Sequence, residues 1–190
     1  VDVYNRQYGK RRWKAPTVIS LAIGQDALVV SPIQMANMCA VIANRGHYYT
    51  PHIVRKVDGT PLNDSTYSVP KYTSIDKKHY STIINGMERV FIGKHGTAKT
   101  AHLKDIEICG KTGTAENPHG DDHSIFIAFA PKDNPKIALA VYVENGGWGS
   151  TWAAPIASLM IEKYLTGKIS NTKQEAFILN GNLMNAEDAK

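Results

Sequence analysis

The stretch Ile106-Glu107-Ile108-Cys109-Gly110-Lys111-Thr112-Gly113-Thr114-Ala115 joins an apolar run to a cation, two hydroxyls and two glycines. The run alternates isoleucine with glutamate, which is typical of a half-buried strand. Lys111 and Thr112 would stand at the end of that strand, where Gly113 lets another molecule approach the backbone. An ammonium group, hydroxyls and unpaired N–H groups together suit a carboxylate or an oxyanion. The stretch therefore predicts an anion-binding strand end, although Lys-Thr-Gly alone also fits a strand without a site.

Further matching segments surround this stretch, from Arg12 to Gly167. They are Leu21–Asp26, Ser31–Ala36, Ala43–Gly46, Pro51–Val54, Gly86-Met87, Gly96–Ala98, Phe126–Pro131 and Gly146–Gly149. Together the segments resemble the class B penicillin-binding proteins, in which Lys-Thr-Gly is the third active-site motif. Within that family the chain is most similar to the transpeptidases of cell elongation.

The resemblance implies a fold and an activity. The fold is of the α/β class in its α+β form, an antiparallel sheet flanked by helices that forms the C-terminal portion of the serine β-lactamase and transpeptidase fold. The activity of the intact protein is that of a serine D,D-transpeptidase, which cross-links peptidoglycan stem peptides and is blocked covalently by β-lactams. Its expected partners are the stem peptide, β-lactams and proteins of the cell-elongation machinery, with no cofactor. Its expected location is the periplasmic side of the bacterial inner membrane, held by an N-terminal membrane helix outside these residues.

The same resemblance assigns roles to side chains near the motif. Lys111 holds the substrate carboxylate and tunes the proton relay, while the hydroxyls of Thr112 and Thr114 hydrogen-bond the substrate. The backbone N–H of Thr114 supplies half of an oxyanion hole, and such a donor is worth roughly 3–4 kcal/mol in other acyl-transfer enzymes. His123 and Trp148 are expected to line the groove.

The family also needs a Ser-x-x-Lys nucleophile motif and a Ser-x-Asn motif upstream of Lys-Thr-Gly. No Ser-x-Asn occurs in the sequence. Ser74–Lys77 matches Ser-x-x-Lys but lies too near Lys111, and Ser170–Lys173 lies after the motif. We therefore expect no nucleophile in these 190 residues, and no covalent catalysis by the chain alone.

Two other functions remain open at this stage. The first is a β-lactam-binding sensor or a β-lactamase of the same fold, although the long region from Gly86 to Leu103 argues against the small hydrolases. The second is a non-catalytic module that docks a partner. The upstream sequence would decide most of this: the two missing motifs and a membrane anchor would support the transpeptidase, and their absence would support the docking module.

Two loops carry weaker signals. His119, Asp121, Asp122 and His123 have metal-binding side chains, but a single hairpin loop rarely supplies enough converging ligands, so we predict no metal. The Gly-rich run Gly146–Thr151 lacks the Gly-Lys-Ser/Thr ending of a phosphate loop and is interpreted as a tight turn.

Composition fits one globular, incomplete domain over residues 1–190, with 43% hydrophobic and 21% charged residues. We expect an arm at 1–13, a globular part at 14–167 and a frayed polar tail at 168–190. The net charge of +5 is spread along the chain, and the basic run Arg6–Lys14 is interpreted as a solvated terminus without nucleic acid. Cys39 and Cys109 are expected to be small buried residues.

Periodicity places the elements. Helices are predicted from Pro32 to a stop at Gly46, from a cap at Ser74 to a stop at Gly93, and over Trp152–Leu165 with a stop at Gly167. Their apolar faces are expected to be Met35, Met38, Cys39 and Ile42 in the first, Tyr80, Ile83, Ile84, Met87, Val90 and Phe91 in the second, and Ile156, Leu159, Met160 and Tyr164 in the third. A strand is predicted over 52–57 and a mobile loop over 92–103. Strands over 106–112, 124–130 and 137–144 are predicted to form an antiparallel meander.

We expect the chain to lack part of the family fold, and this would favour its association with other copies. In the resembled fold, further strands complete the sheet beside the strand of residues 137–144, and a nucleophile-bearing helix covers the groove. Without them, the edge of that strand and the helix faces at 35–42 and 83–91 would be left open. We therefore expect this chain to self-associate.

Overall fold

The computed structural model describes residues 2–25, 28–62 and 64–183. The chain divides into two compact units, Val1–Ser31 and Pro32–Lys190. The second unit contains the Lys-Thr-Gly motif and the sheet, and it is the unit that bears on function.

The first unit is helical, where the sequence had predicted an irregular arm. Helix α1 spans Asp2–Tyr8 and α2 spans Ala15–Ala22. Buried Tyr4 lies with its ring centroid 6.0 Å from those of both Tyr8 and Trp13. The prediction was wrong because this aromatic cluster, which the polar composition hides, gives the segment a small core of its own.

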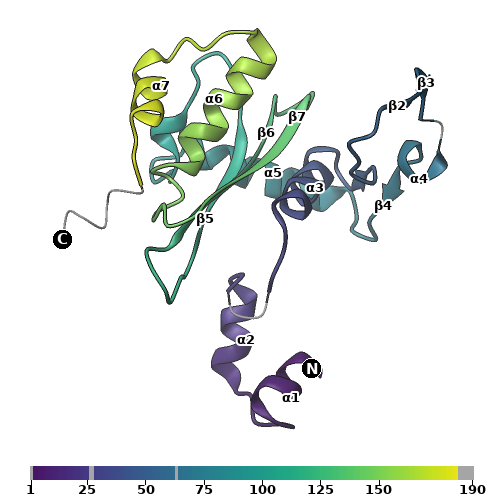
Figure 1. Ribbon diagram of the computed structural model, residues 1–190, viewed down its shortest axis with the longest axis vertical. Helices are drawn as coiled ribbons and strands as arrows, with labels where there is room; N and C mark the ends of the chain where they lie inside the picture. The colour runs from purple at the N-terminus through teal and green to yellow at the C-terminus, as the bar shows by residue number, and fades with distance from the viewer. Residues whose placement is uncertain (1, 26–27, 63, 184–190) are drawn as a thin grey trace. The chain divides into compact units, whose positions relative to one another are not determined.

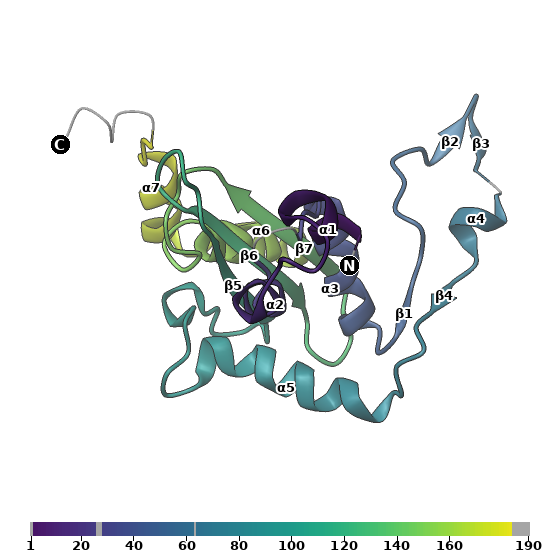
Figure 2. The same cartoon turned by 90° about the horizontal axis from the view of Figure 1, so that it is seen from below.

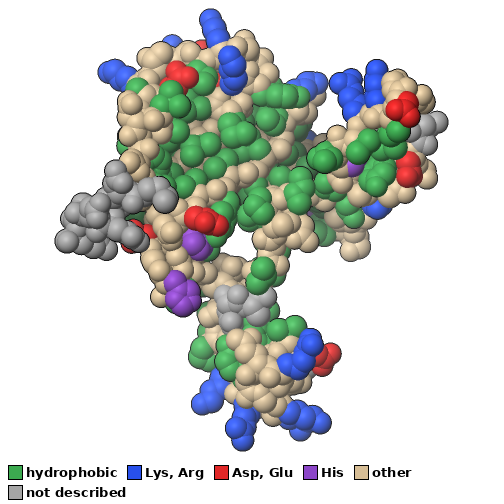
Figure 3. Space-filling model, viewed as in Figure 1, with side chains coloured by type: hydrophobic (Ala, Val, Ile, Leu, Met, Phe, Trp, Pro, Cys, Tyr) green, Lys and Arg blue, Asp and Glu red, His purple; other side chains and the backbone are tan. Residues whose placement is uncertain are grey.

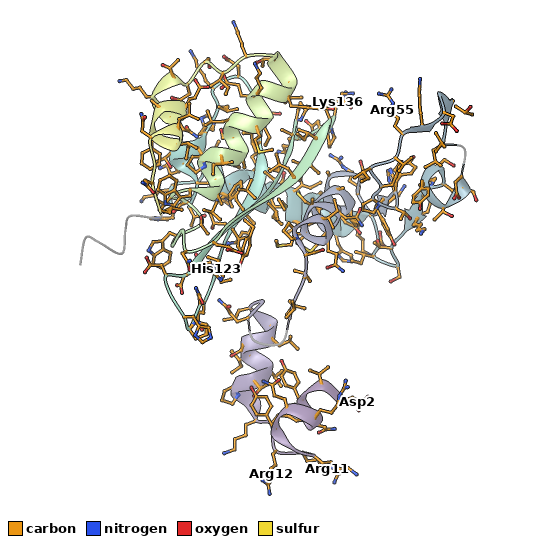
Figure 4. The ribbon with its side chains drawn as sticks, viewed as in Figure 1. Asp2, Arg11, Arg12, Arg55, His123 and Lys136 are labelled. Carbon is orange, nitrogen blue, oxygen red and sulfur yellow. The ribbon has the colours of Figure 1, made fainter. Side chains whose placement is uncertain are left out.

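The basic run lies on the outside of this first unit. Arg11 and Arg12 point away from its helices (Figure 4). Neither forms an ion pair within the part of the chain that the structure describes.

Three antiparallel strands in the order β5-β6-β7 form the main sheet (Figure 1). They are β5 Cys109–Ala115, β6 His123–Ala130 and β7 Ile137–Val143. The predicted meander is thereby confirmed, but β5 begins and ends three residues later than predicted. Cys109 pairs with Phe129, so Glu107 and Ile106 would have to pair with Pro131 and Lys132, which lie beyond the end of β6 at Ala130.

Helices cover both faces of this sheet (Figure 2). Phe126 and Ala128 share a core with α6, which spans Ala153–Thr166, close to the predicted bounds. Phe129 and the adjoining Ile127 belong to a second core with α3 and α5. The alternation of side chains along β6 therefore fixes which helix meets which face.

Helix α6 buries Leu159 from the predicted stripe, but the rest of its buried face differs from the prediction. Small residues, Ala153, Ala154, Ala157 and Ser158, lie buried with Ile161 against the sheet. The predicted apolar stripe includes Met160 and Tyr164, whose side chains are 50% and 64% exposed. Small side chains occupy the buried face of α6 because they let the helix approach the strands closely.

The outward stripe of α6 adjoins an apolar cavity of about 440 Å³, lined by Ile137, Leu159 and Ile178 among others. Hydrophobic side chains gather over α6 and β7 in the space-filling view (Figure 3).

Helix α3 spans Pro32–Ala43, and the chain turns at Gly46 as predicted, with φ of 111°. Its buried residues are Cys39 and Ala43, whereas Met38, assigned to the same face, is 51% exposed.

Helix α5 spans Lys78–Ile92 and ends at Gly93 as predicted. It begins later than expected, because Asp76 rather than Ser74 accepts the Lys78 N–H, at 3.0 Å. Its buried side chains are Tyr80, Ile84, Met87 and Phe91, whereas Ile83 from the predicted stripe is 50% exposed.

Two segments predicted as irregular are packed. Within 92–103 there is a 3-10 turn, η1, at Lys99–Ala101, and Ala98 and Ala101 are fully buried. The predicted frayed tail contains α7, Thr172–Leu179, which begins at Asn171 with a hydrogen bond from the Gln174 N–H and packs on α6. Residues 184–190 of that tail lie outside the described residues.

The region between α3 and α5 holds only short elements. Strand β1, His47–Tyr48, pairs with β4, Lys71–Tyr72, and β2, Lys56–Val57, pairs with β3, Thr60–Pro61. A single turn, α4, covers Ser65–Ser68. The predicted strand over 52–57 therefore forms only at its last two residues. There a turn at Asp58 and Gly59, which both have positive φ values, reverses the chain so that β3 can pair with β2.

Cys39 and Cys109 are both fully buried free thiols in the same core, as the sequence predicted. Burial raises the pKa of each thiol to about 12. In the described residues, no helix combines the length and apolar character that crossing a membrane requires.

One edge of β7 pairs with no strand in the described part of the chain, in line with the open edge predicted from the sequence. Together with the exposed apolar side chains of α6, this edge favours pairing with a second copy. We expect sedimentation at micromolar concentration to show a species larger than the monomer. A monomer at every concentration would contradict this prediction.

Candidate functional site

The Lys-Thr-Gly motif lies within β5 rather than beyond its end. Lys111 pairs with Ile127 and Thr112 with Phe126, so the two side chains leave the strand on opposite faces. Lys111 is on the face of α3 and α5, and it is exposed. Its Nζ donates a hydrogen bond to the Thr112 carbonyl oxygen at 2.8 Å, so the ammonium group stays beside the motif backbone.

The hydroxyl of Thr112 has a partner that the sequence did not reveal. Its Oγ1 lies 2.9 Å from Oγ1 of Thr97, in the segment between α5 and η1. The next residue, Ala98, is fully buried and donates its N–H to the Val90 carbonyl at 3.0 Å. Thr97 is therefore held by a packed backbone, and it fixes the position of the Thr112 hydroxyl.

The loop after β7 lies directly against the motif strand. A Cβ on Gly149 would be 2.4 Å from the carbonyl oxygens of both Gly113 and Ile125. Only a residue without a side chain allows this approach. The predicted turn at 146–151 is thus present, and Gly149 brings it onto the motif backbone.

Ser124 ties this loop to the start of α6. Its side chain is fully buried, its Oγ donates to the Trp148 carbonyl at 2.9 Å, and it accepts the Ala153 N–H at 3.2 Å. It pairs with Thr114 in the sheet. Sequence reasoning missed Ser124, although a lone serine in an apolar strand was the available signal.

His123 and Trp148 lie near the motif but differ in their contacts. His123 pairs with Ala115, and its Nδ1 accepts the Asn145 N–H at 3.1 Å. Figure 4 shows His123 at one end of the sheet and Lys136 at the other. The Trp148 side chain is 74% exposed. Both remain candidates for lining a groove.

The loop between β5 and β6 is joined to the loop after β7 by polar contacts. Asn117 Nδ2 donates to Asn145 Oδ1 at 2.7 Å, and the Gly147 N–H donates to the Asp122 carbonyl at 2.7 Å. The Asp122 carboxylate accepts the Asn117 N–H at 3.3 Å. Across the described residues, including His119 and Asp121, no three potential metal ligands converge.

The two rejected Ser-x-x-Lys matches lie in structural positions, and so does a third match that sequence reasoning missed, Ser68–Lys71, where the Ser68 hydroxyl donates to the Asp64 carbonyl at 3.0 Å. Ser74 is in the turn before α5, and the Ser170 hydroxyl donates to Glu162 Oε1. Lys173 is in the first turn of α7.

Comparison with known families identifies this arrangement. Residues 2–162 match the family model of the penicillin binding protein transpeptidase domain. The chain belongs to this family. The motif-bearing strand at the edge of the sheet is thus part of a transpeptidase domain.

Individual relatives agree with this assignment. Peptidoglycan D,D-transpeptidase MrdA of Haemophilus influenzae is 30% identical over 91% of this chain and 30% of its own length. The solved structure of Pseudomonas aeruginosa PBP2 in complex with WCK 5153 has a TM-score of 0.74 at 34% identity, over 90% of this chain and 38% of that one. Penicillin-binding protein A from M. tuberculosis, as an imipenem acyl-enzyme, has a TM-score of 0.62 at 31% identity, over 77% of this chain and 33% of that one. This transpeptidase-domain chain therefore spans about a third of the length of the relatives it matches.

Proposed function

We propose that the chain forms the C-terminal part of a class B penicillin-binding protein that cross-links peptidoglycan stem peptides. In this proposal the nucleophilic serine lies outside the 190 residues, and an acyl-enzyme forms in the longer protein. The observation that carries the proposal is the position of the motif: Lys111 is exposed on one face of an edge strand, in a chain of the transpeptidase family.

The proposal gives each motif residue a role. Lys111 holds the substrate carboxylate near the reacting centre, and the Thr112 and Thr114 hydroxyls hydrogen-bond the substrate, with the Thr114 N–H as an oxyanion donor. Gly113 keeps the strand open to the substrate backbone. His123 and Trp148 line the groove, and the exposure of the indole supports its place there.

β-Lactams are the expected covalent inhibitors, because the mycobacterial relative is captured as an imipenem acyl-enzyme. A protein of cell elongation is the expected partner: the PBP2 of Helicobacter pylori, with a TM-score of 0.70 at 26% identity over 87% of this chain and 30% of that one, is seen in complex with MreC. The expected place of action is the periplasmic side of the inner membrane.

The alternative functions have less support. The curated relatives reported above are transpeptidases rather than sensors or β-lactamases. A pure docking module would have no need of an exposed lysine, ordered hydroxyls and a glycine contact on one strand.

Labelling with a fluorescent penicillin tests the proposal. We expect the 190-residue chain to stay unlabelled, because the nucleophile is absent, and a version extended upstream through the Ser-x-x-Lys motif to be labelled stoichiometrically. A stoichiometric mass increase of the 190-residue chain would show that one of the rejected serines, Ser74 first, is a nucleophile.

A further inference from the structure

A pocket beside the motif strand is lined by lysines and hydroxyl-bearing residues that have no role in the proposed reaction. Its volume is about 660 Å³, and it is lined by the segment around η1, the loop before α6 and the first turns of α7. None of the four motif residues, 111–114, is among the residues that line it. It is therefore a separate cavity from the surface on which Lys111 lies.

The charge of the pocket is one-sided. Lys99 and Lys173 line it, and no aspartate or glutamate does. Neither lysine forms an ion pair with any residue that the structure describes. Among the described residues, the Lys99 ammonium group makes a single hydrogen bond, a long one of 3.4 Å to the Lys94 carbonyl oxygen. Two lysines therefore line one cavity, with no carboxylate among the described residues that line it.

Uncommitted hydroxyls accompany the lysines. Thr100, Ser150 and Thr151 line the same pocket, and their hydroxyls make no hydrogen bond within the described part of the chain. Ammonium and hydroxyl groups are the donors that oxyanions accept from.

The walls between these donors are held by other contacts. Gln174 Nε2 donates to the Pro155 carbonyl at 3.1 Å, and Asn171 bonds the Gln174 side chain at 2.9 Å. Phe177 stacks on Trp152 with ring centroids 5.1 Å apart. The pocket is thus bounded by α6 and α7 packed together, and its free donors are the charged and hydroxyl groups alone.

We propose that this pocket binds a small ligand through an oxyanion group, a phosphate or a carboxylate. Solvated surface lysines are the ordinary alternative, but they do not require a cavity whose lining gathers, from three segments, two lysines without an ion pair and three hydroxyls without a hydrogen bond among the described residues.

One residue that lines the pocket is in contact with the motif. Thr97 lines it, and the Thr97 hydroxyl is the partner of Thr112. Only the Thr97 side chain would separate a bound anion from the motif strand. Binding of the anion should therefore change the environment of Thr112.

Titration of the ¹⁵N-labelled 190-residue chain tests the proposal. Inorganic phosphate and citrate are added separately at constant ionic strength, with sodium chloride as the reference. We expect saturable shifts of the backbone amides of Thr97, Thr100, Thr151 and Lys173 with at least one anion. The double variant Lys99→Gln/Lys173→Gln should bind that anion at least about tenfold more weakly, because two charge-assisted contacts are lost.

A matched control removes the same charge elsewhere. Lys104→Gln/Lys136→Gln takes two exposed lysines from outside the pocket and should bind like the unchanged chain. Phosphate alone, or citrate alone, giving saturation would identify the group that the pocket prefers. Equal weakening in the control variant, or shifts that follow chloride as well, would overturn the proposal. Lys173→Gln alone, at an exposed helical position, serves as the test should the double variant fold poorly. None of these results depends on penicillin labelling, so the two proposals can fail separately.

Discussion

Replacing Lys111 by alanine in the longer protein should slow acylation by a labelled penicillin by about a hundredfold or more. The expected size follows from the loss of a charged group beside developing negative charge, where one donor is commonly worth a factor of 10² to 10³. The exposed lysine has no carboxylate partner among the described residues, so its removal should leave the fold intact. Acylation rates at several penicillin concentrations measure the effect.

His119→Ala is the matched control for this experiment. His119 is exposed in the loop between β5 and β6, and only its backbone N–H bonds to Asn117. Its removal should change the acylation rate less than twofold. If Lys111→Ala labelled as fast as the unchanged protein, while both unfolded at the same temperature, the assigned role of Lys111 would be wrong.

Gly149→Ala should destabilise the 190-residue chain by about 2–4 kcal/mol, at or above the usual cost of overpacking. The added methyl group would meet two backbone carbonyl oxygens at 2.4 Å, and backbone atoms cannot rotate away as a side chain can. The loop at 146–151 must then move off β5, away from Gly113. For a chain of this size, each kcal/mol corresponds to roughly 2–4 °C in melting temperature.

Gly86→Ala provides the comparison, because a Cβ there meets nothing within 4 Å and the residue lies inside α5. This substitution should be neutral or stabilise by up to about 1 kcal/mol through helix propensity. Thermal melts of both variants followed by circular dichroism make the measurement. Equal melting temperatures for Gly149→Ala and the unchanged chain would mean that the loop does not rest on the motif strand in solution.

Local patterns in the sequence were sufficient to predict the central sheet and the family to which the chain belongs. Nearly continuous apolar, β-prone runs at 124–130 and 137–143, joined by a six-residue link that contains two prolines, predict an antiparallel hairpin from local sequence alone. The helical bounds near Gly46, Gly93 and Gly167 follow from the same kind of local signal, since each glycine ends a pattern of helical period. The motif residues 111–114 could be found because they are consecutive.

Only the tertiary structure decided the features that depend on contacts between distant residues. The register of β5 is set by where β6 leaves the sheet at Pro131, and the buried face of α6 is set by how closely small residues let it approach the strands. The partner of Thr112 is 15 residues away, and Ser124 bonds across 24 and 29 residues. Hydrophobic periodicity reports which residues of a segment are apolar, but not which neighbours meet them. For that reason the sequence by itself determined the meander and the motif, whereas the packing of Gly149, the Thr97 contact and the basic pocket required the folded chain.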